Sequence, residues 1–132
     1  VGAVHAGWRG CAAGIVEKTV REMVRLLGAR PERILAALGP CIGKCCFETD
    51  SDVPEAMRAS ALGAEAEPYL ERRGEKWHVD LAGLNRQWLL RAGVAPDHID
   101  VCGLCTACRP DLFWSHRKMG EARGVQAAVI SL

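Results

Sequence analysis

The strongest constraint on the fold is a long amphipathic helical pattern near the start of the chain. From Cys11 to Leu27, apolar residues recur at spacings of three and four, and charged residues fill the opposite face. Gly28 is a typical helix stop, and Pro31 prevents the helix from resuming. A second pattern of this kind, also followed by a glycine, covers residues 81–91. The sequence therefore predicts two helices, over 11–27 and 81–91.

Short apolar segments around these helices predict strands. We expect strands over residues 1–6, 33–38, 77–80, 99–104 and 124–132. A short helix over 53–60 can be capped by Asp50 or Ser51, whereas residues 62–75 show no clear pattern. Helices and strands alternate irregularly, and we find no repeat or linker. This arrangement predicts an α+β (mixed α/β) fold, a single domain with a mixed β-sheet flanked by helices.

The chain begins in an apolar, strand-like run, Val1-Gly2-Ala3-Val4. Natural termini usually open with a few polar, poorly ordered residues. We therefore interpret Val1 as an internal position of a longer protein and expect the domain to be N-terminally incomplete.

The composition favours a soluble intracellular protein. The 17 basic and 16 acidic residues give a net charge of +1, which argues against a nucleic-acid surface. No apolar run approaches the ~20 residues needed to cross a bilayer, so we expect no membrane partner. The seven cysteines are an odd number, and no secretory signal precedes them. Free thiols in a reducing cytoplasm are the simplest interpretation.

Three segments carry candidate binding residues at or beyond predicted strand ends, where ligand sites commonly lie. In residues 5–10, His5 precedes a glycine turn with Trp8 and Arg9, and a guanidinium can bind a phosphate or carboxylate through two donors. Residues 39–48 form a glycine-rich loop ending in a carboxylate. Residues 113–117 offer Arg117 as an anion clamp, to which Arg123 can add a second charge.

The cysteines leave two interpretations open. Cys102, Cys105 and Cys108 have two successive C-x-x-C spacings, and with cysteines of the 41–46 segment they can form a thiolate site for zinc or an iron–sulfur cluster. Against this, Cys102 lies in a predicted strand, so it need not converge with Cys105. The second C-x-x-C pair of a zinc ribbon is also absent. Buried thiols that pack as small hydrophobes are the alternative.

Taken together, these segments resemble the laccase-domain purine nucleoside phosphorylase family, the YfiH/YlmD type, also called multicopper polyphenol oxidoreductase. The resemblance runs in family order along nearly the whole chain, and the H-A-G-W-R-G segment from His5 to Gly10 is its most specific part. The other matching segments are Gly39 to Gly43, Cys46-Phe47-Glu48, the Asp80 strand end with its helix, Cys105-Thr106, and Phe113 to Arg117. The resemblance implies that residues 1–132 are the C-terminal part of one such domain.

The resemblance also implies a zinc site of two histidines and one cysteine, in which His5 is one metal ligand and a catalytic residue. The family's other ligands lie upstream, in V-H-G and A-D-C-x-P segments that this sequence does not contain. A catalytic zinc usually needs three protein ligands. We therefore expect this chain alone to bind zinc poorly and to be inactive.

The implied activity is phosphorolysis of adenosine, inosine, guanosine and methylthioadenosine, with adenosine deaminase activity. The partners are then a purine nucleoside and phosphate, while monomer and homo-oligomer both stay open. We assign a catalytic role to Arg9, and both Arg9 and Arg117 are candidates for holding the phosphate, Arg117 as a substrate-binding residue. For the nucleoside, Glu48 or Asp80 would contact the sugar, and Trp8 or Phe47 would stack on the base.

Three other functions compete with this one. Copper binds more tightly than zinc to nitrogen and sulfur ligands, so a copper-loaded protein could act as a laccase-like polyphenol oxidase, at least in vitro. A cysteine-rich structural metal or redox module is the second alternative. A non-catalytic binding domain is the third.

Overall fold

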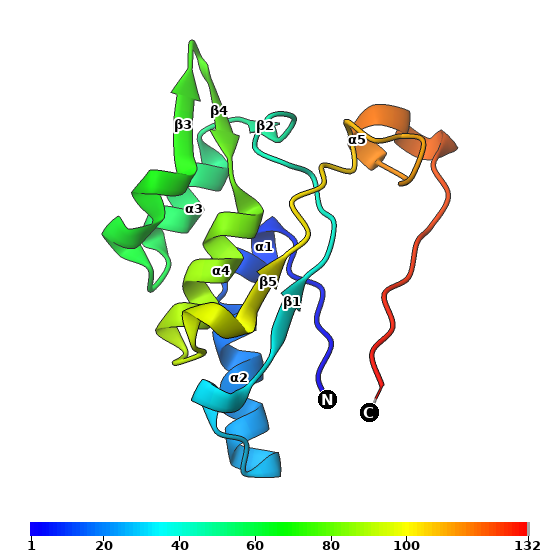
Figure 1. Cartoon of the computed structure of the whole chain (residues 1–132). Coiled ribbons are helices and arrows are strands. Elements are labelled where there is room, and N and C mark those ends of the chain that lie inside the picture. The colour runs from blue at the N-terminus through cyan, green and yellow to red at the C-terminus, as the bar shows by residue number, and fades with distance from the viewer. Residues whose placement is uncertain (132) are drawn as a thin grey trace.

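Two helices correspond to the main predicted helical patterns in the computed structural model, which describes residues 1–131 (Figure 1). Helix α4 (Leu81–Arg91) has the predicted bounds. It packs against α2 (Ile15–Leu27), which ends at Gly28 in the left-handed conformation. The short helix α1 (Trp8–Ala12) precedes α2 and also contacts α4.

Gly14 divides the helix that we expected over 11–27. It has a φ of 69°, in the left-handed region that favours glycine. A Cβ atom at Gly14 would lie 3.3 Å from the indole ring of Trp88. The left-handed backbone at Gly14 leaves α1 and α2 as separate helices, and α1 begins three residues earlier than predicted.

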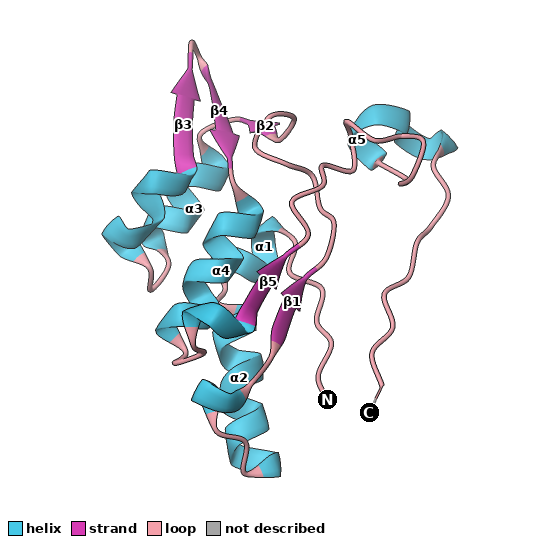
Figure 2. Cartoon of the chain, viewed as in Figure 1, coloured by secondary structure: helices cyan, strands magenta, loops and turns pink. Residues whose placement is uncertain are grey.

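The strands form two small sheets (Figure 2). Strands β1 (Ala36–Leu38) and β5 (Ile99–Val101) pair in parallel, with Ala36 opposite Ile99. The second sheet is antiparallel, in the order β2-β4-β3. Its members are β2 (Glu48–Thr49), β3 (Leu70–Arg73) and β4 (Lys76–Val79). The predicted mixed α/β class is confirmed, with the parallel and antiparallel strands divided between separate sheets.

Shorter elements connect these sheets. The predicted helix over 53–60 is α3 (Asp52–Ala59). The region without a clear pattern holds the 3-10 helix η2 (Gly63–Tyr69) and β3. Further single turns complete the chain: η1 (Pro31–Arg33), η3 (Pro96–His98), α5 (His116–Met119) and η4 (Gly120–Ala122). The turn η1 and the loop after Val101 shorten the strands expected over 33–38 and 99–104.

The strands predicted over residues 1–6 and 124–132 are wrong for the described part of the chain. Residues 1–6 and 124–131 are extended but form no strand, and residue 132 lies outside the described range. A strand needs a neighbour that accepts and donates its backbone hydrogen bonds. Within residues 1–131 the strands β1 to β5 pair only with one another. Val4 and Val129 are accordingly 43% and 93% exposed.

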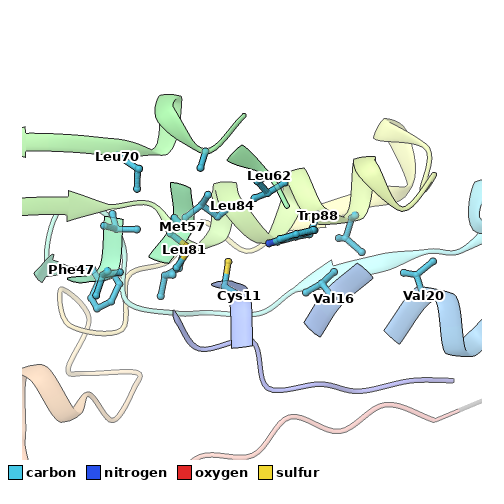
Figure 3. Close-up of a cluster of buried hydrophobic side chains, with 14 of the residues drawn as sticks. Cys11, Val16, Val20, Phe47, Met57, Leu62, Leu70, Leu81, Leu84 and Trp88 are labelled. Carbon is cyan, nitrogen blue, oxygen red and sulfur yellow. The ribbon is translucent and has the colours of Figure 1, made fainter. Parts of the chain in front are cut away.

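A single cluster of buried side chains joins the helices to both sheets (Figure 3). Trp88, Met57, Leu84 and Cys11 are almost completely buried at its centre. Phe47 extends the same cluster toward β2 and β4. The strands β1 and β5, from which two loops leave, therefore pack on this core.

The longest helix of the described residues, α2, has 13 residues. Across residues 1–131, no helix combines the length and the apolar character that crossing a bilayer requires.

Candidate functional site

The parallel strands β1 and β5 direct two loops to the same end of their sheet. Beyond the strands, the backbone pairing continues as an isolated bridge between Cys41 and Cys105. The Thr106 N–H donates to the carbonyl oxygen of Cys41 at 2.9 Å. Figure 1 shows both loops running together toward β2 and α5. Segments more than 60 residues apart thus meet beyond the strand ends, where we expected a site.

An open depression of about 320 Å³ lies beside these loops. It brings together an acidic, an imidazole and two basic side chains, next to thiols. The lining residues are Cys45, Cys46, Glu48, His78, Ala107, Arg117 and Lys118. This mixture of positive charge and a carboxylate suits a ligand that carries both an anionic group and hydroxyls.

Arg117 ties the C-terminal segment to the glycine-rich loop. Its Nη1 donates to the carbonyl oxygens of Glu48 at 2.8 Å and of Cys46 at 3.3 Å. Its guanidinium carbon lies 5.7 Å from the ring centroid of Phe47. The structure therefore places three of the predicted substrate-binding residues, Phe47, Glu48 and Arg117, in one group.

His78 is a functional candidate that the sequence patterns did not indicate. It lies opposite Glu48 in the β2–β4 pair, and its Nε2 is 3.6 Å from the Glu48 Oε2. Its Nδ1 lies 2.8 Å from the carbonyl oxygen of Lys44. A carbonyl only accepts, so Nδ1 carries the hydrogen and Nε2 of the neutral ring is free as a base. The strand register that creates this pair is not visible in the sequence.

His5, Trp8 and Arg9 lie elsewhere. The carbonyl oxygen of Ala6 accepts a 3.2 Å hydrogen bond from Asn85 of α4, which fixes this segment against the core. His5 is exposed, and Arg9 stacks over Trp8 at 4.4 Å from the ring centroid. None of the three lines the depression. Within the described residues, the segment of His5 and the group around Arg117 are thus separate features.

Two further predicted residues are engaged in local structure. The Asp80 Oδ1 accepts the Gly83 N–H at 2.9 Å, so Asp80 is the N-cap of α4. Arg123 donates to the Nδ1 of His116 and lies outside the depression lining. Capping and a surface contact account for these positions, and their roles in substrate binding stay predictions.

Four cysteines gather where the two loops meet. The sulfur atoms of Cys45, Cys46, Cys105 and Cys108 all lie within 4.8 Å of one another. We call these four residues the cysteine cluster. Cys108 Sγ is 3.6 Å from Cys45 Sγ and 3.4 Å from Cys46 Sγ. Cys102, which follows the end of β5, is outside the group, in agreement with the expectation that it need not converge with Cys105. The pair that faces Cys105 and Cys108 is the adjacent Cys45-Cys46, not a second C-x-x-C.

The thiols of the cluster differ in pKa. Burial favours the neutral thiol of Cys105, but the backbone N–H groups of Gly43, Cys108 and Ala107 outweigh it and lower its pKa to about 6. Contact with Cys46 raises the pKa of Cys108, and burial together with Cys108 raises that of Cys45. Adjacent thiols therefore resist joint deprotonation in the absence of a cation.

Comparison with known proteins places this geometry in a family. All 132 residues match the family model described as multi-copper polyphenol oxidoreductase laccase. The chain belongs to this family. It is 46% identical over its whole length to a purine nucleoside phosphorylase of Deinococcus radiodurans. It is 36% identical over 118 residues to the purine nucleoside phosphorylase YlmD of Bacillus subtilis.

The solved structures agree with this assignment. The crystal structure of the Bacillus licheniformis hypothetical protein YfiH matches 87% of the chain with a TM-score of 0.81 and 38% identity. The chain covers 43% of that structure, 49% of the Deinococcus protein and 42% of the Bacillus subtilis protein. This family member thus spans less than half the length of these relatives.

Proposed function

We propose that the full-length protein containing this chain is a zinc-dependent purine nucleoside phosphorylase. The names of its relatives support phosphorolysis, and the grouping of Arg117, Lys118, Glu48 and His78 around one depression is the observation that carries it. Phosphate would cleave the bond between base and sugar of adenosine, inosine, guanosine or methylthioadenosine. The products are the free base and a sugar 1-phosphate. Adenosine deamination, which consumes water and releases ammonia, is the second proposed activity.

The residues of the depression match what phosphorolysis requires. Arg117 and Lys118 supply positive charge for phosphate, with Arg9 as a further candidate. Glu48 can stabilise the positive charge that develops on the sugar, or bind its hydroxyls. His78, held by the Lys44 carbonyl at Nδ1, offers its Nε2 as a base that can accept a proton from the substrate. From the sequence-based assignment we also propose that Phe47 or Trp8 stacks on the purine and that Asp80 assists Glu48 at the sugar, although none of the three lines the depression.

His5 suits one position of the proposed catalytic zinc site and cannot make the site alone. Its imidazole is exposed and free to bind a metal. Among residues 1–131, no group of three potential metal ligands includes His5. The remaining ligands would come from outside this chain, which supports the expectation that the chain by itself is inactive. Zinc in such a site would lower the pKa of bound water to ~7, which is the chemistry that deamination needs.

Copper-dependent phenol oxidation is the chemistry that the family description names. Copper exceeds zinc in affinity for the same ligands, so a copper-loaded preparation can oxidise phenols without this being the physiological role. The curated relatives are named for phosphorolysis, and the charged depression suits phosphate better than a neutral phenol. We therefore place nucleoside chemistry first.

The direct test incubates the full-length protein with adenosine and phosphate, and measures adenine and ribose 1-phosphate. Arg117→Ala should raise the KM for phosphate by about 10- to 100-fold, the value of one hydrogen bond between charged groups. Arg109→Ala is the matched control, because Arg109 pairs with Asp111 outside the depression. Adenine that forms equally well without phosphate, or no adenine at all, would contradict the proposal.

A second arm tests the proposed metal ligand. His5→Ala in the full-length protein should remove most of the activity and one equivalent of zinc. The 132-residue chain alone should release no adenine. Full zinc content and activity in His5→Ala would exclude His5 as a ligand and leave the phosphate arm standing.

A further inference from the structure

We propose that Cys45, Cys46, Cys105 and Cys108 bind a single zinc ion through four thiolates, at a structural site separate from the His5 segment. The site joins the loop after β1 to the loop after β5. It does not rest on the proposed catalytic activity, and it revises the expectation that the chain alone binds zinc poorly.

The spacing of the sulfur atoms fits one tetrahedral ion. Zinc–sulfur bonds of ~2.3 Å place the sulfurs of a tetrahedral site about 3.8 Å apart. The Sγ atoms of Cys46 and Cys45 lie 3.4 Å and 3.6 Å from that of Cys108, and all four sulfurs lie within 4.8 Å of one another. An iron–sulfur cluster binds its thiolates through more than one iron and needs a wider arrangement. A single ion is therefore the better fit.

Two tight turns hold the four thiols in place before any metal binds. In the first, the N–H groups of Cys46 and Phe47 both donate to the carbonyl oxygen of Gly43 at 2.9 Å. In the second, the Arg109 N–H donates to the carbonyl oxygen of Cys105 at 3.1 Å. The Gly43 N–H donates to the Cys105 sulfur at 3.2 Å and links the turns. Such N–H donors to sulfur are the outer contacts that orient metal ligands.

Glycine is needed where the turns touch. A Cβ atom at Gly43 would lie 3.1 Å from the Cβ of Cys105 and 3.3 Å from the Cys45 sulfur. Any larger residue would have to push the two cysteine-bearing turns apart. The sequence thus keeps its smallest residue at the point of closest approach between the turns.

Basic residues surround the cluster and can balance its negative charge. Lys44 lies within the first turn and pairs with Glu71 at 2.7 Å. Arg73 pairs with the same Glu71 at 2.6 Å, and Arg117 donates to the carbonyl oxygen of Cys46. Four thiolates with one Zn²⁺ carry a net charge of −2. Zinc binding forms the Zn–S bonds, releases the thiol protons to water and requires no oxidant.

Packing alone does not explain these cysteines. Cys45 and Cys108 are exposed, whereas a cysteine that serves as a small hydrophobe is buried, as Cys11 is. A zinc ion would fix the positions of Ala107, Cys46 and the neighbouring Glu48, which line the depression. The proposed site would thus stiffen the wall of the proposed substrate pocket.

The test uses the full-length protein with His5→Ala, so that the proposed catalytic ligand is already removed. We expect one tightly bound zinc per chain, and an X-ray absorption spectrum with four sulfur neighbours at ~2.3 Å. Cobalt(II) in place of zinc should give the intense thiolate charge-transfer bands of a tetrahedral tetrathiolate site. Both spectra are measured without altering any cysteine of the cluster, so they do not depend on a variant that folds.

Variants then assign the ligands. Cys108→Ser should reduce bound zinc at least tenfold, whereas Cys102→Ser should keep it, since Cys102 is exposed and outside the cluster. Zinc with nitrogen or oxygen neighbours, equal zinc in both variants, or a Cys46–Cys108 disulfide in freshly purified protein would overturn the proposal.

Discussion

Cysteine has opposite surroundings in two regions of this molecule. In the core, Cys11 of α1 is fully buried and faces α4, near Trp88 and Met57 (Figure 3). Burial raises the pKa of Cys11 to about 12, and the nearby Trp88 side chain offsets only part of the rise. The second region, which we call the rim, is where the loops after β1 and β5 meet. There the cysteine cluster lies near the surface, and N–H donors lower the pKa of Cys105 to about 6. The neighbours of a thiol, more than its residue type, decide whether it packs or reacts.

The largest expected difference between the two regions is the loss of stability when a tryptophan is replaced by alanine. Trp88→Ala removes a side chain that is 1% exposed and leaves a cavity beside Gly14 and Cys11. We expect a loss of about 3–5 kcal/mol in the free energy of unfolding, measured with urea. Trp114→Ala at the rim is the matched control, because Trp114 is 47% exposed and should cost about 1 kcal/mol or less. Equal losses would show that the core is not centred on Trp88.

Replacing one glycine in each region compares their effects on stability and on zinc binding. Gly14→Ala forces a side chain into the left-handed region against Trp88, and should cost about 1–2 kcal/mol of stability. Gly43→Ala should change the unfolding free energy less but weaken zinc binding about tenfold, because it moves ligand-bearing turns. Urea unfolding and a zinc competition assay on both variants test this. A larger zinc effect from Gly14→Ala would contradict the division into two regions.

The pH dependence of stability gives the smallest expected effect. Because the folded-state pKa of Cys11 is raised from 9.0 to about 12, the unfolded chain loses this proton first as pH rises. Cys11 therefore contributes stability below pH 9 that is lost progressively above it, about 1 kcal/mol by pH 10. Cys11→Ala should remove this part of the alkaline loss when unfolding is measured at pH 8 and pH 10. An unchanged alkaline slope in the variant would show that Cys11 titrates normally.

The core was largely predictable from the sequence. Helix α4 has the predicted bounds because local signals agree there: the apolar spacing and a stop at Gly93. The interruption at Gly14 was missed, because the apolar spacing continues across this glycine and does not show that its backbone turns left-handed next to Trp88. The strands expected at both ends of the described chain depended on apolar runs alone. An apolar run does not specify a pairing partner.

The rim was less predictable, because it depends on contacts between distant segments. The C-x-x-C spacing of Cys105 and Cys108 indicated a possible thiolate group, and the expectation that Cys102 need not converge with Cys105 agrees with its place outside the cluster. The other half of the cluster, Cys45-Cys46, lacks the usual spacing and is recognisable only once β1 and β5 are paired in parallel. His78 was missed for the same reason, since its pairing with Glu48 depends on strand register.

One measurement tests the contrast between core and rim most directly: mass-spectrometric mapping of alkylated cysteines in the native full-length protein, with and without a zinc chelator. We predict that Cys102 is modified at once and Cys11 only after unfolding. The cysteine cluster should be protected until the chelator is added, after which its thiols should react. Reaction of the cluster at the same rate with and without the chelator, or early modification of Cys11, would contradict the account.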